Sequence, residues 1–162
     1  MNDTVCSNNE AGMFVTVWLG ILELSTGRIT ACNAGHDDPA VYRKGGTFEL
    51  VKTKHDIAVG AMGGLPYSDY EIQLNKGDKL FLYTDGVPEA TDKDMKMLSL
   101  GTMVDTLNRH KEETPQKILE GIYRGINEFV AAAPQFDDIT MLCLELKEAE
   151  GKNGGMPAED AL

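Results

Sequence analysis

Cysteine is scarce in this chain of 162 residues, which contains only Cys6, Cys32 and Cys143. The number is odd and no Cys-x-x-Cys or Cys/His spacing occurs, which argues against a disulfide framework and against structural zinc. Cys32 and Cys143 lie in strand-like runs, where we expect them to be core residues.

Long apolar runs and an excess of positive charge are also missing. No stretch approaches the ~18 apolar residues that a membrane-spanning helix requires, and no signal peptide opens the chain. Fifteen Lys and Arg stand against 26 Asp and Glu, a formal net charge of -11. We therefore expect that this chain neither binds nucleic acid nor contacts a membrane, and we predict a cytoplasmic protein.

The length fits one domain, and a hydrophobic content of 42% is enough to build a core. We place that domain at residues 13–147. Residues 1–12 are polar and without periodicity, which indicates a leader or the remnant of a preceding element. Residues 148–162 are rich in Gly, Glu and Lys and are predicted to form a flexible tail.

The most informative stretch runs from Lys79 to Asp92. Its apolar segment, residues 80–83, lies between two acidic turns, a pattern typical of a strand buried on both faces. Pro88 is predicted to occupy the first turn of a helix that follows. Glu89 would then lie near the positive end of that helix, or would interact with metal-bound water.

Strand-like composition recurs along the chain, and two segments have helical periodicity. Residues 13–24 are apolar on both alternating faces, which favours a central strand. Thr114 is a plausible N-cap for the clearest helix, residues 115–131. The other expected strands are 28–34, 40–43, 47–51, 69–74 and 139–146, with a short one at 57–59 and a second helix at 102–109. Hairpins, then helices, then one last strand predict an α+β fold with a mostly antiparallel sheet.

Two acidic turns can carry chemistry. Asp85-Gly86 follows the strand at 80–83, and Asp137-Asp138 precedes the strand at 139–146. If these strands are antiparallel neighbours, the carboxylates can converge and bind a hard divalent cation such as Mg²⁺ or Mn²⁺. Ordinary strand-boundary turns are the alternative, because Asp is common at such turns.

Four motifs occur in a specific order: MFVTVWLG, AGHDDP, YTDGVPEA and FDDITML. With the Gly-Asp-x-Leu lead-in at residues 77–80, this series resembles the SpoIIE/RsbU-like branch of the metal-dependent 2C-type serine/threonine phosphatases, over residues 13–147. The resemblance implies part of an α-β-β-α sandwich, in which two antiparallel sheets are flanked by helices. It also implies a two-metal site at one edge, where water attacks the phosphate of phosphoserine or phosphothreonine.

The resemblance assigns roles to particular positions. Asp85 and Asp137 match metal-ligand aspartates, whereas Asp138 and Gly86 support the ligands from neighbouring positions. The family's Asp-x-x-Gly-His-Gly motif, which carries the metal-bridging aspartate, does not occur in this sequence. We therefore expect the C-terminal part of a catalytic domain, weakly active or inactive by itself.

Several residues allow two interpretations. His36 could be a metal ligand or general acid, or a turn histidine satisfied by local carboxylates. Residues 54–70 could shape substrate access or form a mobile connector. The methionines between Met95 and Met103 could bind a partner or fill the core. His55 and His110 are expected at the surface.

The resemblance implies a bacterial signalling phosphatase whose substrate is a phosphorylated regulatory protein of the anti-anti-sigma factor type. A non-catalytic regulatory or interaction module with the same fold is the alternative, and an α+β domain with accidental acidic turns is a second. Exposed apolar strand faces would also permit a homo-oligomer.

Overall fold

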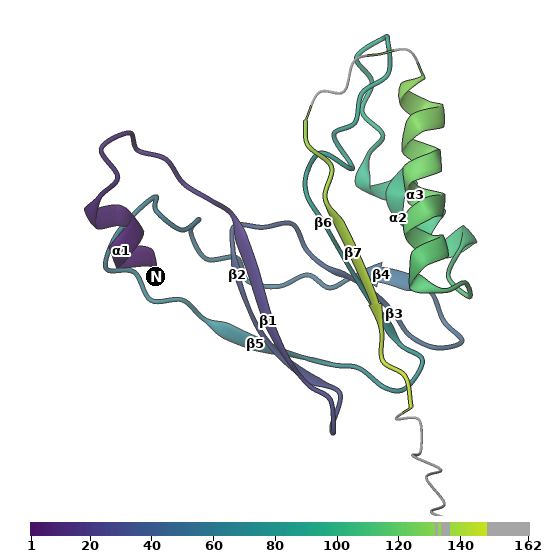
Figure 1. Cartoon of the computed structure of the whole chain (residues 1–162), viewed down its shortest axis with the longest axis horizontal. Coiled ribbons are helices and arrows are strands. Elements are labelled where there is room, and N and C mark those ends of the chain that lie inside the picture. The colour runs from purple at the N-terminus through teal and green to yellow at the C-terminus, as the bar shows by residue number, and fades with distance from the viewer. Residues whose placement is uncertain (132, 134–136, 149–162) are drawn as a thin grey trace, which may run out of the picture.

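Two antiparallel sheets form the framework of the computed structural model, which describes residues 1–131, 133 and 137–148 (Figure 1). One sheet has the strand order β1-β2-β5 and the other β4-β3-β6-β7. The strands are β1 (Val17–Glu23), β2 (Arg28–Ala34), β3 (Ala40–Tyr42), β4 (Phe48–Leu50), β5 (Asp69–Gln73), β6 (Lys79–Tyr83) and β7 (Met141–Glu145). The helices are α1 (Asn2–Ser7), α2 (Leu100–Arg109) and α3 (Pro115–Val130).

The sheets and helices stack in layers. One apolar cluster, which includes Ile29, Ile72 and Leu80, joins the two sheets. A second cluster, which includes Phe81, Met103 and Ile122, joins the β4-β3-β6-β7 sheet to α2 and α3 (Figure 1). Every named strand pair is antiparallel. The predicted α+β class with antiparallel sheets is therefore confirmed.

Strand β6 is buried on both faces, as its continuous apolar sequence predicts. Leu80 faces the other sheet and Phe81 faces the helices, with exposed fractions of 1% and 0%. The strand lies between β3 and β7. It thus places Asp85, two residues beyond Tyr83, at the end of a rigid element.

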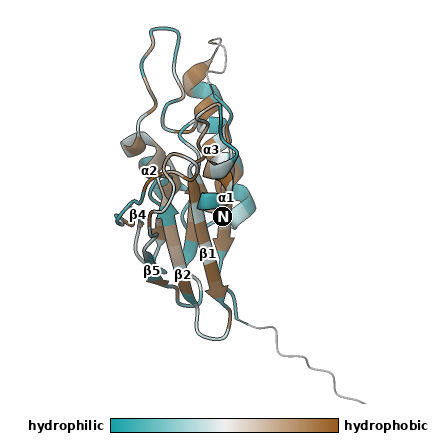
Figure 2. Ribbon diagram, turned by 90° about the vertical axis from the view of Figure 1, so that its left-hand side faces the viewer, coloured by the Kyte–Doolittle hydropathy of each residue, from teal (hydrophilic) through white to brown (hydrophobic). Residues whose placement is uncertain are grey.

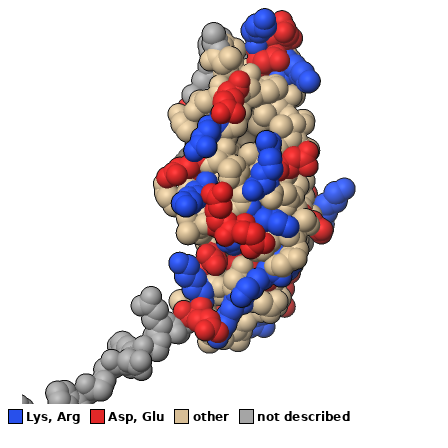
Figure 3. All heavy atoms as spheres, turned by 90° about the vertical axis from the view of Figure 1, so that its right-hand side faces the viewer, with Lys and Arg blue, Asp and Glu red and all other residues tan. Residues whose placement is uncertain are grey.

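Helix α3 begins where the sequence places it. The hydroxyl oxygen of Thr114 accepts a hydrogen bond from the Lys117 amide, and Pro115 occupies the first turn. Its apolar side, including Ile118 and Ile122, is buried. The opposite side is charged, and Figure 3 shows Lys, Arg, Asp and Glu interspersed over this face of the molecule.

The position of β1 corrects the prediction of a central strand. It lies at the edge of its sheet and spans residues 17–23 rather than 13–24. Trp18 and Leu22 pack against the inter-sheet cluster, whereas Leu19 and Ile21 are 59% and 70% exposed. The apolar run on both faces thus corresponds to one buried face and one open face, and much of the strand is coloured as hydrophobic in Figure 2.

Three smaller expectations also differ from the structure. No helix begins at Pro88, because Val87 to Ala90 form a turn whose buried side chains join the core. Residues 57–59 form no strand, only an isolated bridge between Val59 and Val15. The polar segment 1–12 contains α1, whose Asn2 is hydrogen-bonded to the backbone of Met62 and Gly60. The predicted tail, residues 148–162, lies outside the described residues except for residue 148.

Buried Asp78 fixes the turn before β6. Burial by itself would raise the pKa of its carboxyl, but hydrogen bonds from the Asn75 and Lys44 amides and the Arg43 guanidinium outweigh burial and lower the pKa below its ordinary value. Because folding lowers this pKa, the ionised carboxylate stabilises the fold at pH values above the pKa of the carboxyl in the unfolded chain. The stabilisation is lost as pH falls through the lowered pKa and the carboxyl becomes protonated.

Replacing Asp78 by asparagine should therefore destabilise the fold at pH 7 by about 1–3 kcal/mol, the cost of leaving buried donors poorly paired. Urea denaturation at pH 7 and at pH 3 measures the effect. The difference between the variant and wild type should shrink at pH 3. An equal difference at both pH values would contradict the assigned role of the Asp78 charge.

Candidate metal centre at the ends of the sheets

The two acidic turns meet, as predicted for antiparallel neighbours. Strands β6 and β7 pair with Tyr83 opposite Met141. The pairing continues past the strands, because the Thr84 amide donates to the Thr140 carbonyl at 3.0 Å. The Thr84 hydroxyl donates to the Asp138 carbonyl at 3.2 Å and accepts from the Thr140 amide at 3.0 Å.

Gly86 sits against the second acidic turn. A methyl group at its Cα would lie 2.4 Å from the carbonyl oxygen of Asp138 and 3.6 Å from the carbonyl carbon of Asp137. Only glycine allows backbones to approach this closely. Gly86 therefore packs directly against the backbone of the Asp137-Asp138 turn, and its role in supporting metal ligands stays a prediction.

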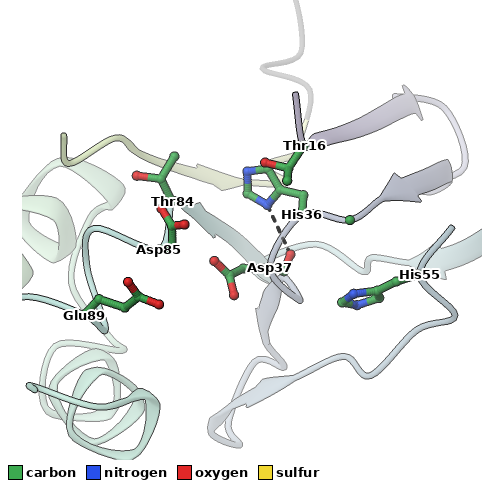
Figure 4. A pocket seen from close by; sticks show the side chains of 8 residues that line it. Thr16, His36, Asp37, His55, Thr84, Asp85 and Glu89 are labelled. Carbon is green, nitrogen blue, oxygen red and sulfur yellow. Dashed lines mark hydrogen bonds between the residues drawn. The ribbon is translucent and has the colours of Figure 1, made fainter. Parts of the chain in front are cut away.

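Asp85 lines a cavity of about 250 Å³ at this end of the two sheets (Figure 4). Its neighbours come from four separate stretches of chain, which only the packing of the sheets brings together. The lining residues are Thr16, Gly35, His36, Asp37, His55, Thr84, Asp85 and Glu89. The cavity is thus strongly acidic on the side formed by Asp37, Asp85 and Glu89.

Asp37 was not predicted as a site residue, yet its carboxylate lies near that of Asp85 (Figure 4). Burial raises the pKa of Asp37; His36 and His55 oppose this shift, while Asp85 and Asp38 reinforce it. The available sequence signal was the acidic pair that follows β2. Its proximity to Asp85 depends on how the ends of β2 and β6 approach, which no local pattern specifies.

Asp37→Asn should raise stability at neutral pH. A carboxyl whose pKa is raised by folding opposes folding when ionised, so the wild type loses this penalty as pH falls through the folded pKa. Removing the charge should add about 0.5–1 kcal/mol at pH 7, as favourable surface-charge changes commonly do. Thermal denaturation at pH 7 measures the gain, and a lower Tm for the variant would show that the carboxylate is stabilised where it lies.

His36 lies in the turn that follows the end of β2. Gly35 has φ of 77°, a conformation that favours glycine, and the His36 amide donates to the side-chain oxygen of buried Asn33 at 2.8 Å. Nδ1 of His36 lies 3.3 Å from the Asp37 carbonyl. This local bonding fits the turn-histidine interpretation, although the ring also lines the cavity.

His55 is exposed, as predicted, and it also lines the cavity. Its Nε2 lies 2.7 Å from an oxygen of Asp38. His110 was also expected at the surface but is only partly exposed, and its Nδ1 lies 3.2 Å from an oxygen of Glu113. Among the methionines, Met103 is fully buried whereas Met95 and Met97 are 73% and 55% exposed, so the cluster divides between core and surface.

Asp137 and Asp138 are exposed and do not line the cavity that Asp85 lines. The Asp137 carboxylate accepts the Asp138 amide at 2.7 Å. The carboxylate oxygens of these turns are of the chemical type that binds a hard divalent cation. Their number is too small, because within the described ranges no three His, Cys, Asp or Glu side chains lie close enough together to hold a metal ion. The metal roles of Asp85 and Asp137 therefore remain predictions.

Two characterised proteins match most of this chain in sequence. "Protein IcfG" of Synechocystis is 26% identical over 144 residues, which are 88% of this chain and 22% of that protein. "Phosphoserine phosphatase RsbU" of Bacillus subtilis is 25% identical over 148 residues, 91% of this chain and 43% of RsbU. The chain thus spans less than half the length of either protein.

Solved structures share the fold. The RsbU and RsbW domains of Rv1364c from Mycobacterium tuberculosis give a TM-score of 0.69 at 19% identity, covering 88% of this chain and 39% of that one. The Mn-presoaked phosphatase domain of SpoIIE from Bacillus subtilis gives 0.66 at 18% identity, covering 90% and 62%. The family described as "Stage II sporulation protein E (SpoIIE)" matches residues 1–147. This chain belongs to the SpoIIE family of 2C-type phosphatase domains.

Proposed function

We propose that this chain forms part of a metal-dependent phosphatase that hydrolyses phosphoserine or phosphothreonine on a bacterial regulatory protein. The observation that carries the proposal is the β6-β7 pairing, which brings the Asp85 turn beside the Asp137-Asp138 turn. Membership of the SpoIIE family supports the reaction class. The cavity beside Asp85 offers space for a phosphoryl group.

The cofactor we propose is Mn²⁺ or Mg²⁺. Mn was soaked into the SpoIIE domain of Bacillus subtilis, and RsbX was crystallised with magnesium. When bound, such an ion lowers the pKa of water and neutralises phosphate charge. Asp85 and Asp137 would supply oxygen ligands, while Gly86 and Asp138 hold the second turn in place.

These residues by themselves should hydrolyse little substrate. The sequence lacks the Asp-x-x-Gly-His-Gly motif, and the described residues bring no three metal-ligating side chains together. A bridging carboxylate would have to come from elsewhere. Hydrolysis of p-nitrophenyl phosphate with Mn²⁺ tests this expectation, and robust turnover that Asp85→Asn abolishes would overturn it.

For the substrate, we propose a phosphorylated protein of the anti-anti-sigma factor type. Support comes from the similarity to RsbU and to a protein that contains both RsbU and RsbW domains. The alternative is an interaction module that keeps the fold without catalysis, and the presence of both Asp85 and Asp137 weighs against it. Divalent-cation binding separates these two proposals.

We also propose that the chain self-associates through β1. Leu19 and Ile21 are exposed, and no described strand pairs with the outer edge of β1. Nothing charged or proline-containing protects residues 17–22 of this edge. Light scattering after size exclusion should show a dimer or larger species for wild type and a monomer for Ile21→Lys. A wild type that is monomeric at every concentration loaded would contradict association.

The proposed compartment is the cytoplasm. None of the described helices is both long and apolar enough to cross a bilayer.

A further inference from the structure

The cavity beside Asp85 poses an electrostatic problem for a phosphorylated substrate. Three carboxylates line it, those of Asp37, Asp85 and Glu89. A phosphomonoester carries a charge of about -1.5 to -2 at neutral pH, so these groups repel it. Among the lining residues, only His36 and His55 can become positively charged.

The two histidines are held differently. His36 contacts a backbone carbonyl of its own turn, at 3.3 Å. Nε2 of His55 faces the carboxylate of Asp38 at 2.7 Å, a short distance typical of a charge-assisted hydrogen bond. When both ring nitrogens carry protons, Nε2–H donates to Asp38 and Nδ1–H can donate to a phosphoryl oxygen. In Figure 4 the His55 ring lies across Asp37 from Asp85 and Glu89.

Asp38 is itself fixed, so the ring is held in one orientation. The same carboxylate oxygen, Oδ1, accepts hydrogen bonds from the Thr53 amide at 3.2 Å and the Thr53 hydroxyl at 3.3 Å. Its side chain is 23% exposed and that of His55 is 40% exposed. The neighbouring cation, Lys54, is engaged by Ser68 at 3.2 Å and by Asp56 at 3.5 Å.

We propose that His55, oriented by Asp38, binds the phosphoryl group of the substrate as it enters this cavity. The proposal rests on the proposed function, because it assigns a substrate-binding residue to that site. It also assigns substrate binding to residues 54–70, since His55 belongs to this loop and lines the cavity. His55 offers a donor that the acidic wall lacks, and Asp38 acts as the positioning residue.

A ring-resolved binding experiment tests the assignment. The whole chain, labelled with ¹³C and ¹⁵N, is titrated with O-phospho-L-serine with and without Mg²⁺, and histidine ring resonances are followed by NMR. The His55 ring signals should move saturably, while those of His110, which does not line the cavity, stay fixed. L-Serine, which lacks the phosphate, should leave His55 unmoved.

Variants then measure the contribution of the ring. His55→Gln should weaken phosphoserine binding about tenfold, the loss expected for one hydrogen bond to a charged group. His110→Gln should leave the affinity unchanged. Asp38→Asn should weaken binding by a smaller factor, because the ring remains but is no longer fixed. Amide shifts of α3, which contributes no residue to the cavity, confirm that each variant stays folded.

The outcomes also separate this inference from the metal-site proposal. If phosphoserine binds with unchanged affinity to His55→Gln, or does not bind to wild type, the assignment of His55 is wrong. If His55 responds to phosphoserine but Mn²⁺ binding is absent, the metal site fails and the His55 assignment stands.

Discussion

Replacing Phe81 by alanine is expected to cost about 3–5 kcal/mol of stability, as large-to-small substitutions of buried phenylalanine do. Phe81 is fully buried in the middle of β6, opposite Ala40 on one neighbouring strand and Cys143 on the other. Its ring stacks on Tyr83 with 5.7 Å between centroids. Against a total stability of about 5–15 kcal/mol, this loss brings the chain close to unfolding.

Phe14 provides the matched control, because the same substitution there removes a side chain that is 65% exposed. Phe14→Ala should change the free energy of unfolding by less than about 0.5 kcal/mol. Urea denaturation followed by circular dichroism measures both variants. Similar losses for the two variants would mean that β6 is not the central strand of the core.

Gly86→Ala should damage the site as well as the fold. The added methyl group would lie 2.4 Å from the Asp138 carbonyl oxygen, a backbone atom that can move only with its turn. Relieving this clash should cost about 1–3 kcal/mol. Because it displaces the Asp137-Asp138 turn from Asp85, it should also weaken Mn²⁺ binding by about 10–100-fold, the usual effect of losing support for ligands.

The matched control is Gly101→Ala in the first turn of α2. A methyl group there has Ser99 Oγ as its nearest neighbour at 3.9 Å, so it fits without displacement. Alanine is the better helix former, and the variant should be neutral or up to about 1 kcal/mol more stable. Tm and Mn²⁺ affinity are measured for both. Wild-type values for Gly86→Ala would show that the two turns are not in close contact.

The elements that could be predicted from sequence are those whose signals are local. Helix α3 is specified by Thr114, Pro115 and a regular apolar face, and β6 by an unbroken apolar run between turns. The helix predicted to begin at Pro88 does not form, because a contact with a more distant part of the chain fixes another conformation. The Pro88 carbonyl accepts the Ser99 amide at 2.9 Å, a bond that ties residues 88–99 into a closed loop instead of a helix.

The site was only partly predictable. Asp85 and the Asp137-Asp138 turn followed from their places at strand ends and from the family motifs. Asp37 and His55 did not, because they reach the cavity through the packing of one sheet on the other. The edge position of β1 was likewise hidden, since an apolar strand looks the same whether its second face is covered or open.

Calorimetric titration of the chain with Mn²⁺ tests the central claim most directly, namely that Asp85 and Asp137 form the protein side of a metal site. We expect weak, saturable binding that Asp85→Asn and Asp137→Ala each abolish. Asp105→Asn, which removes an exposed carboxylate from α2, should leave it unchanged. Absence of binding in wild type, or binding that survives both site substitutions, would contradict the account.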